Sequence, residues 1–222
     1  MDYCVGQIQY NYRAAKHQAG TRGLQNAASK GLAVVIMEPL RGGALARNIP
    51  PAVQLLWDSY LPPAAAGGTE GGYHRTPADW ALQWLWNQPE VSLVLSGMST
   101  MEQVEQNLQS ADRSGVGTMS EEELALVARV REAYLALCAI PCTGCQYCLP
   151  CPQGVAIPDV LSVYNEGRMF GEDHARAMYK WIDEKYRGDQ CIECGECLEK
   201  CPQGIDIPEW MKRVHEGLGL RQ

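Results

Sequence analysis

Three apolar segments in the first 100 residues have the character of β-strands. The clearest is LAVVIMEPL, residues 32–40, which is almost continuously apolar, carries β-branched residues and is stopped by Pro39. An apolar run of this length is typical of a strand that is buried on both faces. We interpret YCVGQIQY, residues 3–10, as a short first strand and VSLVLSGMS, residues 91–99, as a third.

Helical patterns separate and follow these strands. One helix ends in front of Gly31, and another begins with Thr76 as its N-cap and Pro77 in its first position. Ser120 and Glu123 have the spacing of a capping box, which marks the start of a further helix. We therefore predict helices over residues 20–30, 76–89, 101–110 and 120–137.

Alternating strands and helices imply a parallel sheet with right-handed crossovers. Three such strands do not close a barrel, which takes eight, and a three-stranded parallel sheet would leave two edges and one face uncovered. The first strand begins almost at Met1. We therefore expect a partner of the chain to complete the layer: an upstream segment, a second polypeptide or a further copy in a homo-oligomer.

Composition narrows the class of protein. Of the 222 residues, 46% are hydrophobic, which is enough for a sizeable core, and the net charge of −7 comes without any block of Lys and Arg. These features argue against a nucleic-acid partner. No apolar run reaches the roughly 18 residues of a membrane span, and the N-terminus lacks the pattern of a secretory signal. We expect a cytoplasmic protein.

Eight of the ten cysteines form two dense runs, each followed by proline. Cysteines two residues apart are poorly placed to pair with one another, but a tight loop lets them converge on one centre, and a reducing cytosol disfavours disulfides. The pattern therefore indicates a metal centre. The two runs are Cys142, Cys145, Cys148 and Cys151, and Cys191, Cys194, Cys197 and Cys201.

The two runs also share the sequence that follows them, CPQGVAIP and CPQGIDIP, which predicts two equivalent halves about an approximate two-fold axis. Zinc is the alternative metal, but Cys4 zinc sites use paired CxxC elements with a longer spacer. We expect the remaining two cysteines, Cys4 in a strand and Cys138 at a helix end, to be small buried apolar residues. Residues 159–187, between the runs, have the spacing of a helical pair.

The cysteine runs resemble the bacterial two-[4Fe–4S] ferredoxin module. In that module the fourth cysteine of each run ligates the other cluster. The resemblance implies one cluster on Cys142, Cys145, Cys148 and Cys201, and a second on Cys191, Cys194, Cys197 and Cys151. The last gap of the first run is two residues in place of the usual three, which bears on the geometry at Cys151.

The N-terminal segments VGQIQYNY, VVIMEPLRGGALA and VSLVLSGMSTMEQVEQNL resemble the sixth, seventh and eighth strand regions of aldo-keto reductases. The whole chain is similar to the C-terminal portion of the iron–sulfur aldo-keto reductases. The resemblance implies an α/β fold in two domains. Residues 1–138 would form part of a (β/α)8 TIM barrel, about three β/α units, and residues 139–222 a mainly α-helical two-[4Fe–4S] domain.

The same resemblance implies a nicotinamide-dinucleotide site, NAD or NADP, at the C-terminal ends of the strands. Met37 stands where many members stack an aromatic ring on the nicotinamide. Basic residues that often grip the 2′-phosphate are replaced by Gly97 and Gln103, so a preference for NADP is not supported. The implied contacts are Gln7 to the nicotinamide amide; Pro39, Leu40, Gly42 and Gly43 along the pyrophosphate; and Gly97, Met98, Ser99, Gln103 and Asn107 around the adenosine ribose phosphate.

No catalytic residue is assigned. The family's catalytic tetrad comes from the first four strands, a region that this chain does not contain. The four histidines lie outside the corresponding strand ends, and we interpret them as surface or helix-face residues: His17, His74, His174 and His215.

Two functions from different classes follow. The first is an iron–sulfur oxidoreductase fragment or subunit of aldo-keto reductase type, in which two [4Fe–4S] clusters transfer electrons coupled to a nicotinamide-dependent carbonyl or alcohol reaction. The second is a non-enzymatic, ferredoxin-like electron carrier whose barrel segment is a docking surface. A nicotinamide gives two electrons as hydride and a cluster takes one at a time, so a redox partner protein or a flavin would mediate. A zinc-stabilised interaction module is a third reading.

Overall fold

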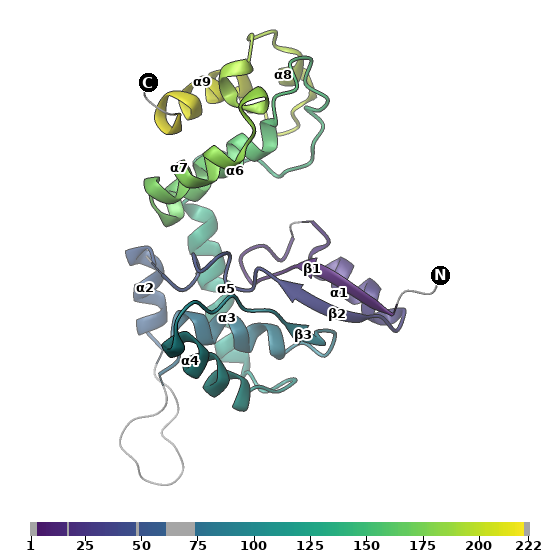
Figure 1. Cartoon of the computed structure of the whole chain (residues 1–222), viewed down its shortest axis with the longest axis vertical. Coiled ribbons are helices and arrows are strands. Elements are labelled where there is room, and N and C mark those ends of the chain that lie inside the picture. Colours follow the sequence, from purple (N-terminus) through teal and green to yellow (C-terminus); the bar gives the residue numbers. More distant parts are fainter. Residues whose placement is uncertain (1–3, 17, 48, 61–73, 220–222) are drawn as a thin grey trace. The chain divides into compact units, whose positions relative to one another are not determined.

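The computed structural model describes residues 4–16, 18–47, 49–60 and 74–219 (Figure 1). The chain divides into two compact units, Met1–Leu135 and Ala136–Gln222, and each is described by itself. The division lies near the end of helix α5 (Glu121–Ala136), whereas the sequence analysis placed it after residue 138. Among the described helices, none combines the length and the apolar character needed to cross a membrane.

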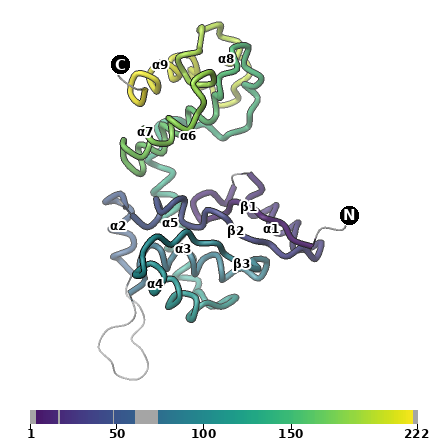
Figure 2. Tube along the Cα trace, in the orientation of Figure 1, coloured from purple at the N-terminus to yellow at the C-terminus, as the bar shows by residue number. Residues whose placement is uncertain are grey.

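The first unit contains a parallel sheet of three strands in the described residues, in the order β1-β2-β3. The strands are β1 (Val5–Gln9), β2 (Ala33–Met37) and β3 (Leu93–Val94), and the trace in Figure 2 follows the chain through them. All three predicted strands are confirmed. The third is shorter than residues 91–99, because β2 ends at Met37 and Glu38 turns the chain away with a φ of +53°.

One face of the sheet is covered by helices α1 (Gly20–Ser29) and α3 (Pro77–Trp86). The end predicted for α1 and the start predicted for α3 are both observed. Gly31 follows α1 with a φ of +75°, and the Thr76 hydroxyl accepts a hydrogen bond from the backbone N–H of Asp79 at 3.1 Å. Between sheet and helices lies a fully buried apolar cluster of Tyr10, Leu24, Val34, Ile36 and Leu85.

The opposite face of the sheet is open. The strand register places Val5, Met37, Leu93 and Leu95 on this face, and 43–53% of each residue's surface is exposed. The structure thus shows the one-sided layer that the sequence analysis expected for a sheet of three strands.

The described residues of the first unit also form the helices α2 (Pro51–Asp58), α4 (Met101–Asp112) and α5. The helix α2 is not among the helices predicted from the sequence. Pro51 occupies the first turn of α2, where the missing N–H costs nothing. The helix is held by Trp57, whose ring stacks on the buried Trp80 ring with centroids 5.2 Å apart.

The predicted capping box at the start of α5 is confirmed and is part of a larger polar cluster. Ser120 donates its backbone N–H to the Glu123 carboxylate at 2.8 Å, and the Glu123 N–H donates to the Ser120 hydroxyl at 3.2 Å. The same carboxylate forms an ion pair with Arg75 at 2.6 Å and accepts a hydrogen bond from the Tyr60 hydroxyl. Glu123 therefore ties α5 to the segments that flank α2 and α3.

The second unit is built mainly of helices. Its core is formed by apolar residues of three helices that pack together, α6 (Ile157–Phe170), α7 (Glu172–Trp181) and α9 (Ile207–Leu218). The expected helical pair between the cysteine runs is present as α6 and α7. The unit also contains two 3-10 turns and one short helix: η1 (Glu184–Tyr186), η2 (Gly188–Gln190) and α8 (Glu196–Lys200).

Close packing of α6 and α7 depends on a glycine. A Cβ atom at Gly167 would lie 2.9 Å from the Cβ of Ala175, closer than side-chain atoms approach one another. Gly171 connects the two helices with a φ of +98°, a conformation that favours glycine. These two positions let α7 fold back along α6.

A buried asparagine fastens the segment in front of the first cysteine run. The Asn165 side chain accepts a hydrogen bond from the Ile140 N–H at 2.9 Å and donates one to the Ile140 carbonyl at 2.8 Å. Both groups of Ile140 are thereby satisfied away from water, which a buried backbone requires. The first cysteine run thus starts from a point fixed on α6.

Replacing Glu123 by Ala should lower the free energy of unfolding by about 2–3 kcal/mol, because the change removes the carboxylate half of the capping box and the nearer of the two carboxylates that pair with Arg75. Urea denaturation followed by tryptophan fluorescence measures this change. The matched control is Glu122→Ala, an exposed residue of the same turn, for which we expect a change within about 0.5 kcal/mol. Equal effects of the two variants would contradict the assigned role of Glu123.

Replacing Asn165 by Ala should destabilise the second unit by about 1–3 kcal/mol, because it leaves a buried N–H and a buried carbonyl unpaired. Asn165→Asp should cost a similar amount, since a carboxylate accepts from the Ile140 N–H but cannot donate to the carbonyl. Thermal unfolding measured by circular dichroism tests both variants. Ser162→Ala, at an exposed position of α6, serves as the control and should change the unfolding temperature little.

Candidate metal centres and cofactor cleft

The two cysteine loops have equivalent backbones. Each contains the hydrogen bond of a tight turn, from Leu149 N–H to the Gln146 carbonyl in the first loop and from Leu198 N–H to the Gly195 carbonyl in the second. Left-handed φ angles of +55° to +78° occur at equivalent places in both halves: Gly144 and Glu193, Gln146 and Gly195, and Gly154 and Gly204. The repeat predicted from CPQG-x-x-IP is therefore present in the fold.

The loops differ in their last gap. In the second loop the extra residue is accommodated by the short helix α8, which runs from Glu196 to Lys200 and ends at Cys201. In the first loop the chain passes a cis peptide bond between Leu149 and Pro150 and reaches Cys151 one residue sooner. Both routes deliver the fourth cysteine to the turn that starts the following helix.

Four thiols line a first cavity in the second unit. Three belong to the first run, and the fourth is Cys201 from the end of the second run. Apolar side chains form much of the rest of the wall, and polar residues from both loops complete it: Pro158, Leu161, Ile205 and Ile207, with Thr143, Gln146 and Gln203. The thiols of this cavity are those of Cys142, Cys145, Cys148 and Cys201.

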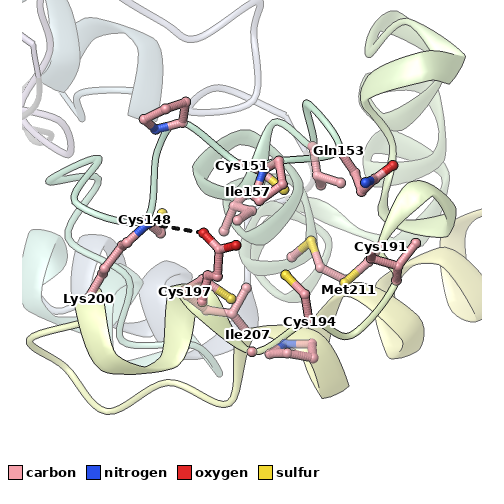
Figure 3. A pocket seen from close by; sticks show the side chains of 17 residues that line it. Cys148, Cys151, Gln153, Ile157, Cys191, Cys194, Cys197, Lys200, Ile207 and Met211 are labelled. Atoms are coloured by element: carbon pink, nitrogen blue, oxygen red, sulfur yellow. Dashed lines mark ion pairs between the residues drawn. The ribbon is translucent and has the colours of Figure 1, made fainter.

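A second cavity has the reciprocal composition (Figure 3). The three thiols of the second run are joined there by Cys151, the last cysteine of the first run, and Met211 and Ile157 form part of its apolar wall. Cys148 lines this cavity as well as the first, so the two cavities share a wall. The structure thus brings together both sets of four cysteines that the resemblance implied: the first set above, and Cys191, Cys194, Cys197 and Cys151.

Three of the thiols are held in surroundings that oppose their ionisation. Burial raises the pKa of Cys142 and Cys148, and the neighbouring Cys201 thiol raises both further. Burial, with the other thiols of its run, also raises the pKa of Cys197 to about 11. Thiols with these pKa values are neutral at pH 7, so binding of a metal group must release their protons.

The donor sets fit iron–sulfur clusters. A [4Fe–4S] cluster is held by four thiolates in an apolar surrounding, and each cavity supplies that set. In the described part of the chain, no three or more His, Cys, Asp or Glu side chains are placed to hold a single metal ion. In a four-iron cluster each thiolate binds a different iron atom. The four sulfur ligands of a cluster therefore lie farther apart than the ligands of a single metal ion.

The two remaining cysteines belong to neither set. Cys138 follows α5 and is half-buried, and Cys4 lies just before β1 and is exposed. The expectation that Cys4 is a buried strand residue was therefore wrong. Cys4 precedes the first residue of β1, a strand at the edge of the sheet, which agrees with its exposure.

The first unit contains a cleft of about 760 Å³ beyond the ends of β2 and β3. Parallel strands end at one edge of a sheet, and the loops that leave them enclose such clefts. Every residue that the resemblance assigned to the cofactor lines this cleft except Gln7, which is exposed on the open face of β1. The predicted residues in the cleft are Pro39, Leu40, Gly42, Gly43, Gly97, Met98, Ser99, Gln103 and Asn107.

One wall of the cleft carries an arginine that the sequence analysis missed. The Arg47 guanidinium donates a hydrogen bond to the Gly42 carbonyl at 3.1 Å and lies over Gly43, where a Cβ atom would be only 2.5 Å from it. With a φ of +89° and no side chain, Gly43 lets the arginine fold back along the loop. The signal in the sequence is a basic residue four positions after a Gly-Gly pair.

The other wall is the start of α4. Thr100 caps this helix by accepting from the Gln103 N–H at 3.3 Å, and the Gln103 side chain accepts from the Ser99 N–H at 2.7 Å. Asn107 donates to the Ser96 hydroxyl at 3.0 Å. A Cβ atom at Gly97 would meet nothing within 4 Å, so the missing side chain leaves open space at the cleft wall.

The histidines do not contribute to this cleft. His174 pairs with the buried Glu166 at 3.2 Å, and His215 is hydrogen-bonded to the Tyr179 hydroxyl at 3.1 Å. His74 is exposed, and His17 lies outside the described residues. Of the described histidines, none lines the cleft.

Comparisons with known proteins agree with this division of the chain. The model of the aldo/keto reductase family matches residues 1–131, and that of the 4Fe–4S dicluster domain matches residues 141–205. No curated protein matches the chain. Among solved structures, the chain is similar to the aldo-keto reductase AKR11C1 from Bacillus halodurans (holo form), with 20% identity and a TM-score of 0.39. The match covers 56% of this chain and 41% of that chain.

The family matches fall on the two parts of the chain that contain the cleft and the cysteine cavities. The chain therefore joins a segment that matches the aldo/keto reductase family to a 4Fe–4S dicluster domain. Since the first match spans more than half of the 222 residues, the chain belongs to the aldo/keto reductase family.

Proposed function

We propose that the chain is the iron–sulfur and cofactor-binding part of an oxidoreductase of aldo-keto reductase type. In this proposal two [4Fe–4S] clusters carry electrons, and the cleft of the first unit binds a nicotinamide dinucleotide that serves a carbonyl or alcohol reaction. The observation that carries the proposal is the exchange of fourth cysteines, Cys201 into the first cavity and Cys151 into the second. This exchange is the arrangement of two-cluster ferredoxins.

The second unit supplies the conditions for electron transfer. Bound clusters accept and donate single electrons. The chain's own part is to hold eight thiolates, to exclude water with Leu161, Ile207 and Met211, and to keep the two sites adjacent through the shared wall at Cys148. Short separation favours electron exchange between the two sites.

The first unit supplies groups for an anionic dinucleotide. Arg47 presents a cation at the loop after β2, and the backbone N–H groups at the start of α4 favour negative charge. Gly42 and Gly97 leave space for a ligand to approach the backbone, since a Cβ atom at either position would meet nothing within 4 Å. The cleft therefore combines a fixed positive charge with open backbone on two sides.

The open face of the sheet supports a role for this chain within a larger barrel. Val5, Leu93 and Leu95 present apolar surface there, and surface of this kind is normally buried. Further β/α units, from an upstream segment or a second polypeptide, would cover it and would supply the acid that protonates a substrate carbonyl. This reading accounts for the open face better than a carrier whose barrel segment only docks.

Substitution of the fourth cysteines tests the exchange. Cys201→Ser should lose the same cluster as Cys145→Ser, and Cys151→Ser the same cluster as Cys194→Ser, because each pair lines one cavity. Iron and sulfide content, with the electron paramagnetic resonance spectrum of the dithionite-reduced protein, identifies which cluster remains. Cys4→Ser and Cys138→Ser are the controls and should retain both clusters. If Cys201→Ser instead matched Cys194→Ser, the ligand sets would not be exchanged.

Replacing Arg47 by Ala should weaken NADH binding about tenfold, as expected for loss of one charge-assisted contact to a phosphate. Titration of the purified chain with NADH, followed by nucleotide fluorescence, measures this affinity. Arg22→Ala, an exposed arginine of α1 away from the cleft, is the control and should bind normally. Absence of any NADH binding to a chain that carries reducible clusters would favour the electron-carrier function instead.

A further inference from the structure

The two cysteine loops carry different charges on equivalent backbones. The second loop bears three carboxylates and one amine, on Glu193, Glu196, Glu199 and Lys200, which give it a net charge of −2. The first loop, residues 142–151, contains no acidic or basic side chain. The two cavities are therefore alike in their thiols and unlike in the charge that surrounds them.

One of these carboxylates occupies an unfavourable backbone position. Glu193 has a φ of +55°, in the left-handed region that glycine adopts without cost, and the equivalent residue of the first loop is Gly144 with a φ of +70°. A side chain in this region is held there against its intrinsic preference. The second loop thus places a carboxylate beside Cys194 where the backbone itself would favour glycine.

The single basic side chain among the described residues lining the two cavities is already paired. Lys200 lies 3.6 Å from the carboxylate of Glu196, and both residues line the second cavity (Figure 3). The ammonium therefore offsets one carboxylate of the loop and leaves the excess of negative charge in place. Water screens these exposed groups, so each contributes modestly.

Acids on the neighbouring helices do not remove the difference. Asp159 lies in the first turn of α6, next to a residue of the first cavity, and Glu209 lies in the first turn of α9, next to a residue of the second. Asp206 caps α9, whose Ile207 lines both cavities. The helix starts are thus acidic at both cavities, and the loops account for the asymmetry.

We propose that Glu193 and Glu196 lower the reduction potential of the second-run site, so that the two sites accept electrons in a fixed order. This inference rests on the proposed function, because it concerns clusters bound by the two sets of thiolates. Reduction adds one negative charge to a site, and carboxylates nearby oppose that charge. The first electron from a one-electron donor comes to rest at the site of Cys142, Cys145, Cys148 and Cys201, and the second electron enters the other site.

The experiment is a reductive titration of the full chain, loaded with iron and sulfide without oxygen, with dithionite as the electron donor. Electron paramagnetic resonance spectra at successive potentials should show two separate one-electron steps. In the double variant Glu193→Gln, Glu196→Gln, the reduction constant of the lower step should rise about tenfold, which corresponds to 59 mV for one electron. The upper step should stay where it is.

Two further variants serve as a control and as a converse test. Glu172→Gln removes an exposed carboxylate at the start of α7, at the far end of the 14-residue helix α6 from the cavities, and should move neither step. Tyr147 is 66% exposed and is the first-loop counterpart of Glu196, so Tyr147→Glu should lower the upper step.

The possible outcomes distinguish a failure of the proposed order of reduction from a failure of the proposed function. Unresolved steps in the unchanged protein, or a double variant that moves both steps equally or moves the upper one, would overturn the order of reduction while leaving the clusters intact. A chain that binds no iron under these conditions, or shows no reducible signal, would overturn the proposed function and the inference with it.

Discussion

Neither cysteine run can complete a cavity alone, because Cys201 is needed at the first and Cys151 at the second. This requirement brings the two loops together, and the helices that leave them then pack against each other. Ile157 at the start of α6 and Ile207 at the start of α9 are both buried in the core of the second unit. The placement of the thiols therefore depends on the packing of α6 against α9. Asn165 of α6 also fixes the segment in front of the first run, through its two hydrogen bonds to Ile140.

The first unit is organised around a sheet. Helices that cover one face stabilise this sheet, and the cleft lies at the ends of its strands. The helices α1 and α3 bury Val34 and Ile36, while Met37 and Leu95 remain exposed on the other side. Because β2 and β3 are parallel, the loops that follow them leave from the same edge and enclose the cleft. The polar cluster around Glu123 holds the later helices in place and contributes nothing to the cleft itself.

Much of this arrangement could be predicted from the sequence, because local chemistry specifies it. The spacing of the cysteines, the capping box at Ser120 and Glu123, and the apolar run of β2 are each patterns of residues that lie close together in the sequence. What could not be predicted depends on contacts distant in sequence. The contacts of Asn165 with Ile140 and the stacking of Trp57 on Trp80 leave no local pattern.

Two further features were not predicted because they also depend on contacts between separate segments. Arg47 reaches the cleft only because Gly43 allows the chain to fold back over itself, and this turn is not evident from composition. The short third strand ends where its neighbour turns away at Glu38, so its length is set by another segment. Sequence patterns therefore identified the residues of the candidate site better than they identified its boundaries.

The exchange of fourth cysteines also fixes the order in which the two sites become complete during synthesis. The second-run site has all its thiols once Cys197 has emerged, and the first-run site has all of its thiols four residues later, once Cys201 has emerged. Cys201 follows Cys148 by about 50 residues, a delay of about 3–10 s at the speed of the ribosome. The cysteines translated first thus belong to the site that is completed last, so metal can fill that site only after the second run has been made.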